Sequence, residues 1–181
     1  MLRRRRQPDD PLAHVDPAAA PPRFAAVVAD ACDSRRRYRE LAASLRPGPV
    51  QDQLVAVGER VDAGVAAVWD TVQRAGQLDR TLATLDPERV TAEYKRARRA
   101  GADPALMSAL AQRFASVQRL LNTLEDTDER LRLLDVRLDA AVARAAEVAL
   151  GGGAGAADVG ADLDGLLQEL ASLRSALDEL G

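Results

Sequence analysis

The chain has 181 residues, of which 47% are apolar, 3% are aromatic and 29% are charged, and its formal net charge is −3. This length suffices for one domain, and the scarcity of aromatic rings means that leucine, valine and alanine must fill its core. Isoleucine is absent, whereas the helix formers alanine, leucine and arginine are frequent, so the composition favours helices over strands.

The sequence predicts a protein of a reducing compartment. Cys32 is the only cysteine, which excludes an intrachain disulfide and a multi-cysteine zinc site. No apolar segment of the kind that a secretory signal needs follows Arg3 to Arg6, and no apolar run approaches the roughly 20 residues of a membrane span. We therefore expect a soluble, cytoplasmic protein. Lys95 is the only lysine among 25 basic residues, a bias that suggests a GC-rich, bacterial coding sequence.

The N-terminal segment differs in composition from the rest of the chain. Residues 1–21 are rich in proline, aspartate and arginine and show no apolar periodicity, so we predict a disordered basic arm. From residue 22 apolar side chains recur at steps of three and four, which predicts a helix over 22–46 that ends at the "RPGP" stretch.

The next helix, predicted over 50–85, has the cleanest apolar pattern. Its seam alternates steps of three and four through Leu54, Val57, Val61, Gly64, Val68, Thr71, Ala75, Leu78, Leu82 and Leu85. Small residues, among them Gly58 and Gly64, keep the first half narrow, so we expect a neighbouring helix to approach closely there. Each of these glycines costs roughly 1 kcal/mol relative to alanine in a helix interior.

Two Asp-Pro pairs mark the starts of the following helices. Aspartate caps free N–H groups of a first turn and proline is tolerated at the first helical position, so Asp86-Pro87 and Asp103-Pro104 predict helices over 87–100 and 104–150. Gly101 stands where a left-handed residue would end the shorter helix.

The long helix carries an apolar seam that is interrupted at Thr127 and Asp128. Such a polar step can fix the register, bend the helix or mark the end of a shorter partner helix. The "GGGAGAA" stretch at 151–157 predicts a flexible linker, and leucines in heptad steps predict a last helix over 158–180. Residues 22–181 are thus predicted to form an elongated antiparallel helical bundle, or coiled-coil hairpin, of four to five helices, with 50–85 antiparallel to part of the long helix.

The residues argue against most catalytic chemistries. The only histidine, His14, lies in the proline-rich arm, which removes serine-histidine, cysteine-histidine and histidine-metal sites. Cys32 fits a small buried apolar residue better than a nucleophile. The glycine tract lacks the Gly-Lys-Ser/Thr ending of a phosphate loop. We predict no catalytic, cofactor-binding or metal site and no small-molecule substrate.

The remaining signal is an uneven distribution of charge. Residues 1–46 carry a net charge of +4, residues 47–100 are neutral, and residues 101–181 carry −7. The candidate residues for binding an anion or a partner are Arg3, Arg4, Arg5, Arg6, Arg35, Arg36, Arg37, Lys95, Arg96, Arg98 and Arg99. For the arm the competing interpretation is a solvated tail, and for Lys95 to Arg99 it is the favourable position of cations at a helix C-terminus. The arginines of the first helix are also expected to lie against acidic residues of the last helix: Asp162, Asp164 and Glu169.

Three functions follow as expectations. The first is a non-enzymatic scaffold or adaptor that binds another protein or a second copy of itself, because wide apolar stripes run along several helices. The second is a peripheral membrane or envelope-stress protein whose basic N-terminal region contacts anionic lipid. The third is a nucleoid-associated protein, which the net negative charge disfavours because phosphate neutralisation supplies most non-specific affinity for nucleic acid.

Overall fold

The computed structural model describes residues 10–151 and 155–179, and it confirms the all-α class. The described residues form five α-helices and two short 3-10 turns, with no strand among them. The turns are η1 (Pro17–Ala19) and η2 (Pro22–Phe24), and the helices are α1 (Ala25–Ser44), α2 (Pro49–Leu85), α3 (Pro87–Arg99), α4 (Pro104–Leu150) and α5 (Ala156–Asp178).

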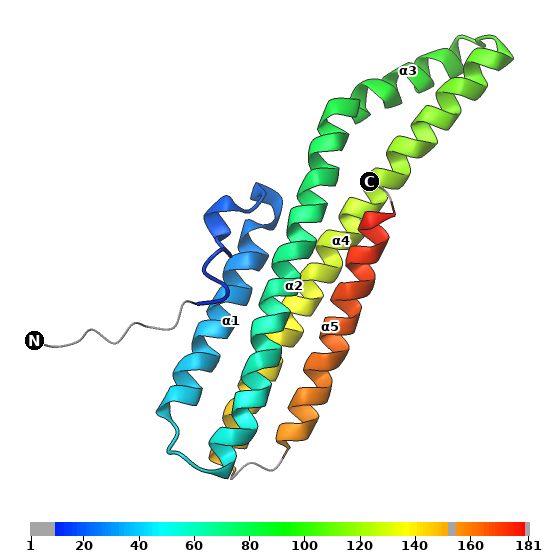
Figure 1. Ribbon diagram of the computed structural model, residues 1–181. Helices are drawn as coiled ribbons and strands as arrows, with labels where there is room; N and C mark the ends of the chain where they lie inside the picture. The colour runs from blue at the N-terminus through cyan, green and yellow to red at the C-terminus, as the bar shows by residue number, and fades with distance from the viewer. Residues whose placement is uncertain (1–9, 152–154, 180–181) are drawn as a thin grey trace, which may run out of the picture.

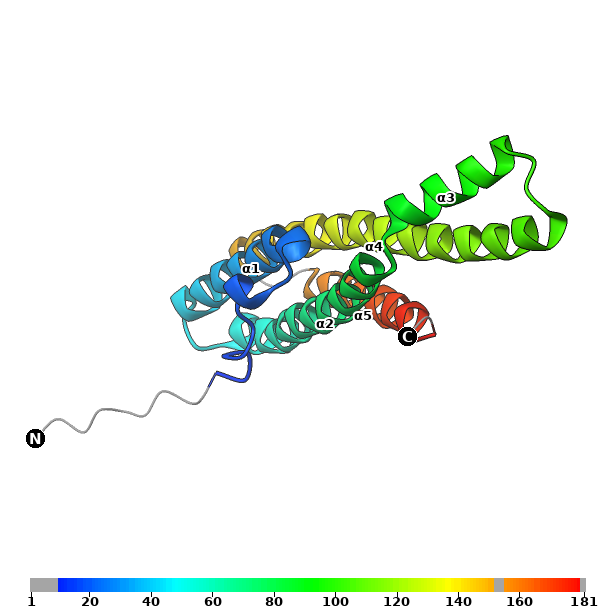
Figure 2. The ribbon, with the colours of Figure 1, turned by 90° about the horizontal axis from the view of Figure 1, so that it is seen from above.

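Helices α2 and α4 form the central antiparallel pair of an elongated bundle (Figure 1). Helices α1 and α5 each pack against both members of this pair, whereas α3 packs mainly against α4. The hairpin of α3 and the first part of α4 extends beyond the other helices (Figure 2). We call residues 87–123 the α3–α4 hairpin and the remaining described parts of α1, α2, α4 and α5 the four-helix body.

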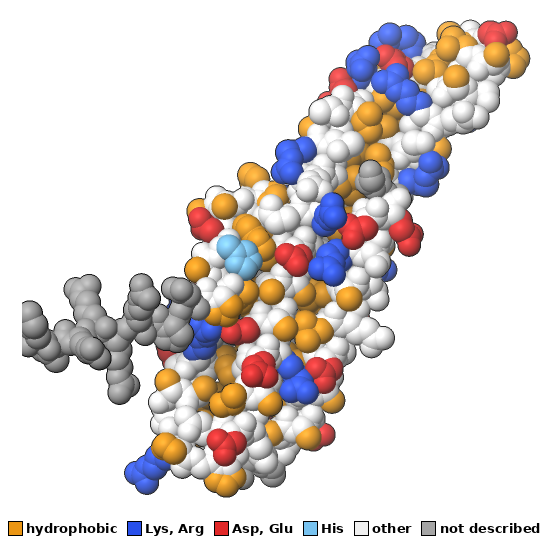
Figure 3. Space-filling model, viewed as in Figure 1, with side chains coloured by type: hydrophobic (Ala, Val, Ile, Leu, Met, Phe, Trp, Pro, Cys, Tyr) orange, Lys and Arg blue, Asp and Glu red, His pale blue; other side chains and the backbone are white. Residues whose placement is uncertain are grey.

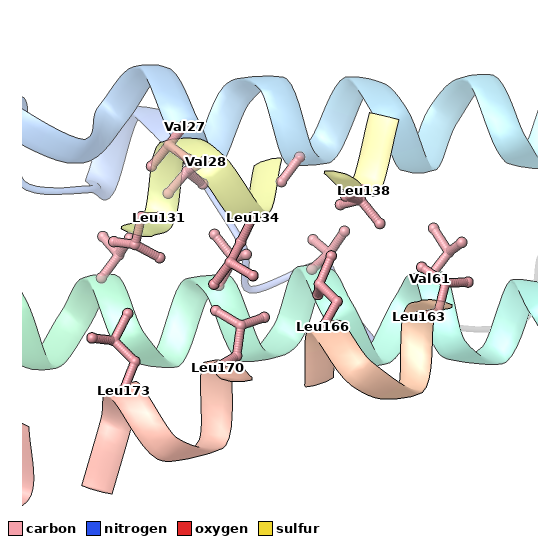
Figure 4. Packing of buried hydrophobic residues seen from close by; sticks show 14 of the residues in the cluster. Val27, Val28, Val61, Leu131, Leu134, Leu138, Leu163, Leu166, Leu170 and Leu173 are labelled. Atoms are coloured by element: carbon pink, nitrogen blue, oxygen red, sulfur yellow. The ribbon is translucent and has the colours of Figure 1, made fainter. Parts of the chain in front are cut away.

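Aliphatic side chains fill the core of the four-helix body and point toward one another from all four helices (Figure 4). The largest fully buried side chains are Phe24, Leu54, Leu124, Leu131, Leu138, Leu163, Leu166 and Leu170. Burying one leucine or valine side chain contributes roughly 1.5–3 kcal/mol. Leucine and valine side chains therefore stabilise the body, as the scarcity of aromatic residues predicted.

The predicted seam of α2 is buried at every position from Leu54 to Ala75. The half of α2 that carries small residues lets α1 approach closely. A Cβ added at Gly58 would lie only 2.9 Å from Cε1 of Tyr38, a residue of α1. Tyr38 is itself buried, and its hydroxyl donates a hydrogen bond to the carbonyl of Leu54. The predicted close approach of a neighbouring helix is thus confirmed at Gly58.

The segment before α1 corrects the prediction of a disordered arm over 1–21. Residues 10–24 form turns that pack against the bundle, with Leu12 only 8% exposed and Phe24 fully buried. Prolines do prevent an α-helix here, as predicted, but they allow the two 3-10 turns, and Asp16 accepts a hydrogen bond that caps η1. The prediction missed this packing because a few isolated apolar residues show no periodicity. Residues 1–9 lie outside the described part of the chain.

The predicted bounds of α2, α3 and α4 agree with the structure to within one residue, and the ends of α1 and α5 differ. Helix α1 starts at Ala25 rather than at 22, because η2 occupies the proline-containing residues before it. Helix α5 starts at Ala156, two residues before the predicted start at 158, so it takes up the last two residues of the predicted linker over 151–157. Gly151 caps α4, and residues 152–154 of that linker lie outside the described residues.

The polar step at Thr127 and Asp128 marks the level at which α1 begins. Thr127 is fully buried and donates its hydroxyl hydrogen bond to the carbonyl of Thr123, 2.7 Å away. Asp128 pairs with Arg23, immediately before α1, at 3.5 Å. Of the three interpretations of this step, the end of a shorter partner helix is the one that the contacts favour.

Candidate functional site

The α3–α4 hairpin is built by the two Asp-Pro signals. Asp86 has a left-handed backbone (φ 52°) and accepts a hydrogen bond from the backbone N–H of Arg89, so the chain turns out of α2 directly into α3. Asp103 caps α4 by accepting from the N–H groups of Ala105 and Leu106. Gly101, at φ 63°, provides the left-handed turn between α3 and α4 that its position predicted.

The two helices of the hairpin meet along a narrow apolar contact. The rings of Tyr94 and Phe114 stack with their centroids 4.7 Å apart, and Val90 and Val117 are buried beside them. Helix α3 offers few other large apolar side chains, so Leu106, near the start of α4, stays 51% exposed. The hairpin therefore keeps apolar surface that the chain itself does not cover.

Four predicted site residues on α3 are exposed cations that have no ion-pair partner among the described residues. Lys95, Arg96, Arg98 and Arg99 are exposed, and no described carboxylate lies within 4.0 Å of their charged nitrogens. The reason lies in the facing helix, because residues 104–124 of α4 contain no aspartate or glutamate. The α3–α4 hairpin holds seven basic and three acidic residues, a net charge of +4 in a chain of charge −3.

A groove of about 600 Å³ runs along α3 beside these cations. Its lining consists of Pro87, Glu88, Thr91, Ala92, Lys95, Arg96 and Arg99 from α3, and Leu121 from α4. Figure 3 shows basic side chains over the α3–α4 end of the molecule, at the top of the view, with hydrophobic side chains next to them. The groove thus combines an apolar floor with a basic wall, whereas Arg98 lies outside its lining.

The predicted cations of α1 have carboxylate partners within the chain. Arg35 pairs with Asp10 at 2.5 Å and with Asp62 of α2 at 2.7 Å, and its side chain is only 11% exposed. Hydrogen bonding to Arg35 holds the pKa of Asp10 well below its usual range, and bonding to Asp10 raises the pKa of Arg35. Arg36 pairs with Asp33 one turn away, and Arg37 pairs with Asp139 of α4.

These pairs correct the expectation that the arginines of α1 lie against the acidic residues of α5. Asp162, Asp164 and Glu169 instead pair with Arg144, Arg60 and Arg137, which belong to α4 and α2. The physical reason is the packing order, since α1 and α5 each lie against the central pair and meet the charges of α2 and α4 first. Arg3 to Arg6 lie outside the described residues.

Burial raises the pKa values of several groups inside the four-helix body, among them Cys32 and Asp135. Burial raises the pKa of the Cys32 thiol, with a smaller opposing effect of Arg35, so this thiol stays protonated and weakly nucleophilic at neutral pH. Burial, assisted by the nearby charges of Asp30 and Asp139, raises the pKa of Asp135 to about 6. Within residues 10–151 and 155–179, no three histidine, cysteine or acidic side chains come together in a way that could hold a metal ion.

Sequence reasoning missed the part of the groove that is not charged. Thr91, Ala92 and Leu121 line it, and none of them is among the predicted site residues. The helical period of α3 could have found two of them, because Thr91 and Ala92 stand three or four residues before Lys95 and Arg96 and so share their face of the helix.

Comparisons with protein-family models, with curated proteins and with solved structures give no match for this chain. Among the described helices, none combines the length and the apolar character that crossing a membrane requires.

Proposed function

We propose that this chain is a non-enzymatic helical scaffold or adaptor that binds a protein partner through the α3–α4 hairpin. The observation that carries this proposal is the groove along α3, in which an apolar floor lies beside cations that have no carboxylate partner among the described residues. Surface that is both apolar and charged, on an element that projects from the body, is typical of an interaction site.

The four-helix body offers a useful contrast. Its arginines are mostly matched by carboxylates of the same chain, for example Arg60 with Asp164 at 2.8 Å and Arg74 with Asp178 at 2.8 Å. Its core side chains are buried against one another, although Val55, Leu133, Val136 and Leu150 stay exposed on its surface, so the contrast with the hairpin lies in the pairing of charges. In this proposal the body is the support from which the hairpin projects.

Contact with anionic lipid through the N-terminal region has less support. Arg35 and Arg37 already bind carboxylates of their own chain, so they would have to break these pairs to reach a lipid headgroup. A basic segment contributes to membrane binding only while its charges are free to approach the surface.

A matched pair of exposed leucines on α4 tests the proposal. Leu106 lies in the hairpin and is 51% exposed, and Leu133 lies in the four-helix body and is 57% exposed. Each position is replaced in turn by a photo-crosslinking amino acid in the full chain, expressed in the organism that encodes it, and the adducts are identified by mass spectrometry.

We expect a discrete adduct with one protein from position 106 and none from position 133. Equal adducts from both positions, or no adduct from position 106, would contradict the proposal. Light scattering on the purified chain identifies the case in which the adduct at position 106 is a second copy of the same chain.

A further inference from the structure

The groove along α3 has features that define the chemistry of its occupant. Building on the function proposed above, we infer that this groove binds an acidic amphipathic helix of the partner protein. The occupant would place carboxylates on Lys95, Arg96 and Arg99 and apolar side chains on Ala92 and Leu121.

The length of the groove suits a helix. Its lining extends along α3 from Pro87 to Arg99, which are the first and last of the 13 residues of that helix. At about 1.5 Å per residue this distance is roughly 18–20 Å, or between three and four helical turns. Lys95 and Arg99 are one turn apart, so carboxylates separated by four residues on an antiparallel or parallel helix would face both.

The positive charge of the groove has no counter-charge among the described residues, so it favours an anionic occupant from outside the chain. The helix C-terminus accounts for a preference for cations in the last turn of α3, but it does not account for the absence of acidic residues over 104–124 of the facing helix. Arg113 of α4 shows how a carboxylate neutralises a cation of the hairpin. It pairs with Glu93 at 3.0 Å, and it lies outside the groove lining. An anionic occupant would supply the missing counter-charge.

The groove also has a direction. Glu88 lies at its start, next to Pro87, whereas Lys95, Arg96 and Arg99 lie at its other end. A helix with carboxylates spread evenly along its length would meet repulsion at Glu88. The preferred occupant therefore has apolar or basic residues at one end and carboxylates at the other.

A protein helix fits these features better than a nucleic acid. Duplex phosphates would gain from the cations but would leave the apolar floor uncovered and would face Glu88. The exposed acidic residues of α5 are weaker candidates for a second copy of the chain, because Asp162, Asp164 and Glu169 already have arginine partners.

The first test uses synthetic helical peptides and the full-length protein. The probe is a fluorescein-labelled peptide of about 18 residues, roughly five turns, with leucines on one face and glutamates toward one end. One comparison peptide has the same composition with the leucines distributed around the helix, and another has lysines in place of the glutamates. Fluorescence anisotropy gives the dissociation constants in low and high salt.

We expect the acidic amphipathic probe to bind at least about tenfold more tightly than either comparison peptide, and to weaken as salt screens the ion pairs. Equal binding of the probe and the peptide with distributed leucines, or preference for the lysine peptide, would overturn the inference. Tighter binding of a labelled DNA duplex or single-stranded RNA at the same groove would overturn the choice of a protein helix.

The second test changes only the charge of the groove. Ala92 is exposed, so Ala92→Glu places a carboxylate three and four residues before Lys95 and Arg96, where it can pair with both in the folded helix. Ala92→Gln has nearly the same size and shape without the charge. We expect Ala92→Glu to weaken probe binding about tenfold and Ala92→Gln by less than about twofold, with unchanged helix content by circular dichroism. Equal effects of the two substitutions would overturn the inference.

A third variant separates the groove from the general charge of the surface. Lys95, Arg96 and Arg99 are reversed to glutamate together, and the control reverses Arg46, Arg80 and Arg130, which are exposed and have no ion pair within the described residues. We expect probe binding to be lost only in the groove variant. If the adduct at position 106 forms in cells but neither the probe nor the groove variant behaves as expected, the proposed function stands and this inference fails.

Discussion

Gly58 and Gly165 both lie within helices, yet their surroundings differ. A Cβ at Gly58 would press on the buried, hydrogen-bonded ring of Tyr38, whereas a Cβ at Gly165 would meet no atom within 4 Å. Alanine is favoured over glycine in a helix interior by about 1 kcal/mol, but overpacking a core costs about 1–3 kcal/mol. The surroundings of each glycine, rather than the residue type, therefore decide whether alanine raises or lowers the free energy of unfolding.

We expect Gly165→Ala to raise the free energy of unfolding by about 0.5–1 kcal/mol and Gly58→Ala to lower it by about 1 kcal/mol. Urea unfolding followed by circular dichroism measures both. A gain in stability from Gly58→Ala would show that α1 does not pack against α2 in the way described.

Asp135 is a carboxylate whose environment disfavours its charge. Its Oδ1 is buried without a hydrogen-bond partner among the described groups, and Asp30 and Asp139 add negative charge while Arg37 opposes them. Its pKa of about 6 in the folded chain lies above the ordinary value of 3.8, so the folded state binds this proton more tightly. The resulting stabilisation is fully present below about pH 4 and is lost as the pH rises through about 6.

Asp135→Asn should therefore stabilise the protein at pH 7.5 by on the order of 1 kcal/mol, a value reduced from the full pKa shift because the side chain is partly exposed. The gain should shrink toward zero near pH 4. Thermal unfolding across this pH range measures it, and Asp126→Asn, at an exposed position of the same helix, provides the control. A gain that is the same at both ends of the range would contradict the raised pKa.

At the scale of the elements, the α3–α4 hairpin is less tightly packed than the helices of the body. No residue of α4 before Val117 is buried, and Val90 is the only buried residue of α3. Segments with few buried apolar contacts open locally before the whole protein unfolds. The hairpin is thus the part of the described chain that we expect to open most readily.

We expect backbone amides of residues 87–116 to exchange with solvent faster than those of residues 54–75, measured by hydrogen exchange with mass spectrometry. Phe114→Ala, which removes the stack with Tyr94, should speed exchange in the hairpin and leave exchange in residues 54–75 unchanged. Equal acceleration in both regions would mean that the hairpin and the body unfold as one unit.

At the scale of the whole molecule, stability depends on the shared core of the four-helix body. Leu131 is fully buried, whereas Leu133, two residues further along the same helix, is 57% exposed. We expect Leu131→Ala to lower the free energy of unfolding by about 2–5 kcal/mol and Leu133→Ala to change it by less than about 0.5 kcal/mol. Urea unfolding distinguishes them, and similar losses at both positions would place the core elsewhere.

Several features of this protein follow from local sequence. The helix starts at Asp86-Pro87 and Asp103-Pro104 depend on hydrogen bonds to N–H groups two or three residues away, and the seam of α2 depends on the helical period. The basic character of α3 is visible in the chain itself. Such signals act over a few residues, so they can be predicted without knowledge of the neighbouring helices.

Only the tertiary structure decided which surface arginines pair with a carboxylate and which do not. Arg35 and Arg99 look alike in the sequence, yet Arg35 meets Asp10 and Asp62 while Arg99 meets no described carboxylate. Their difference depends on which helix lies opposite, and pairs such as Arg60 with Asp164 join residues 104 positions apart. The same holds for the packing of Leu12 and for the groove floor at Leu121, because burial is set by the arrangement of several helices and not by the order of residues in one.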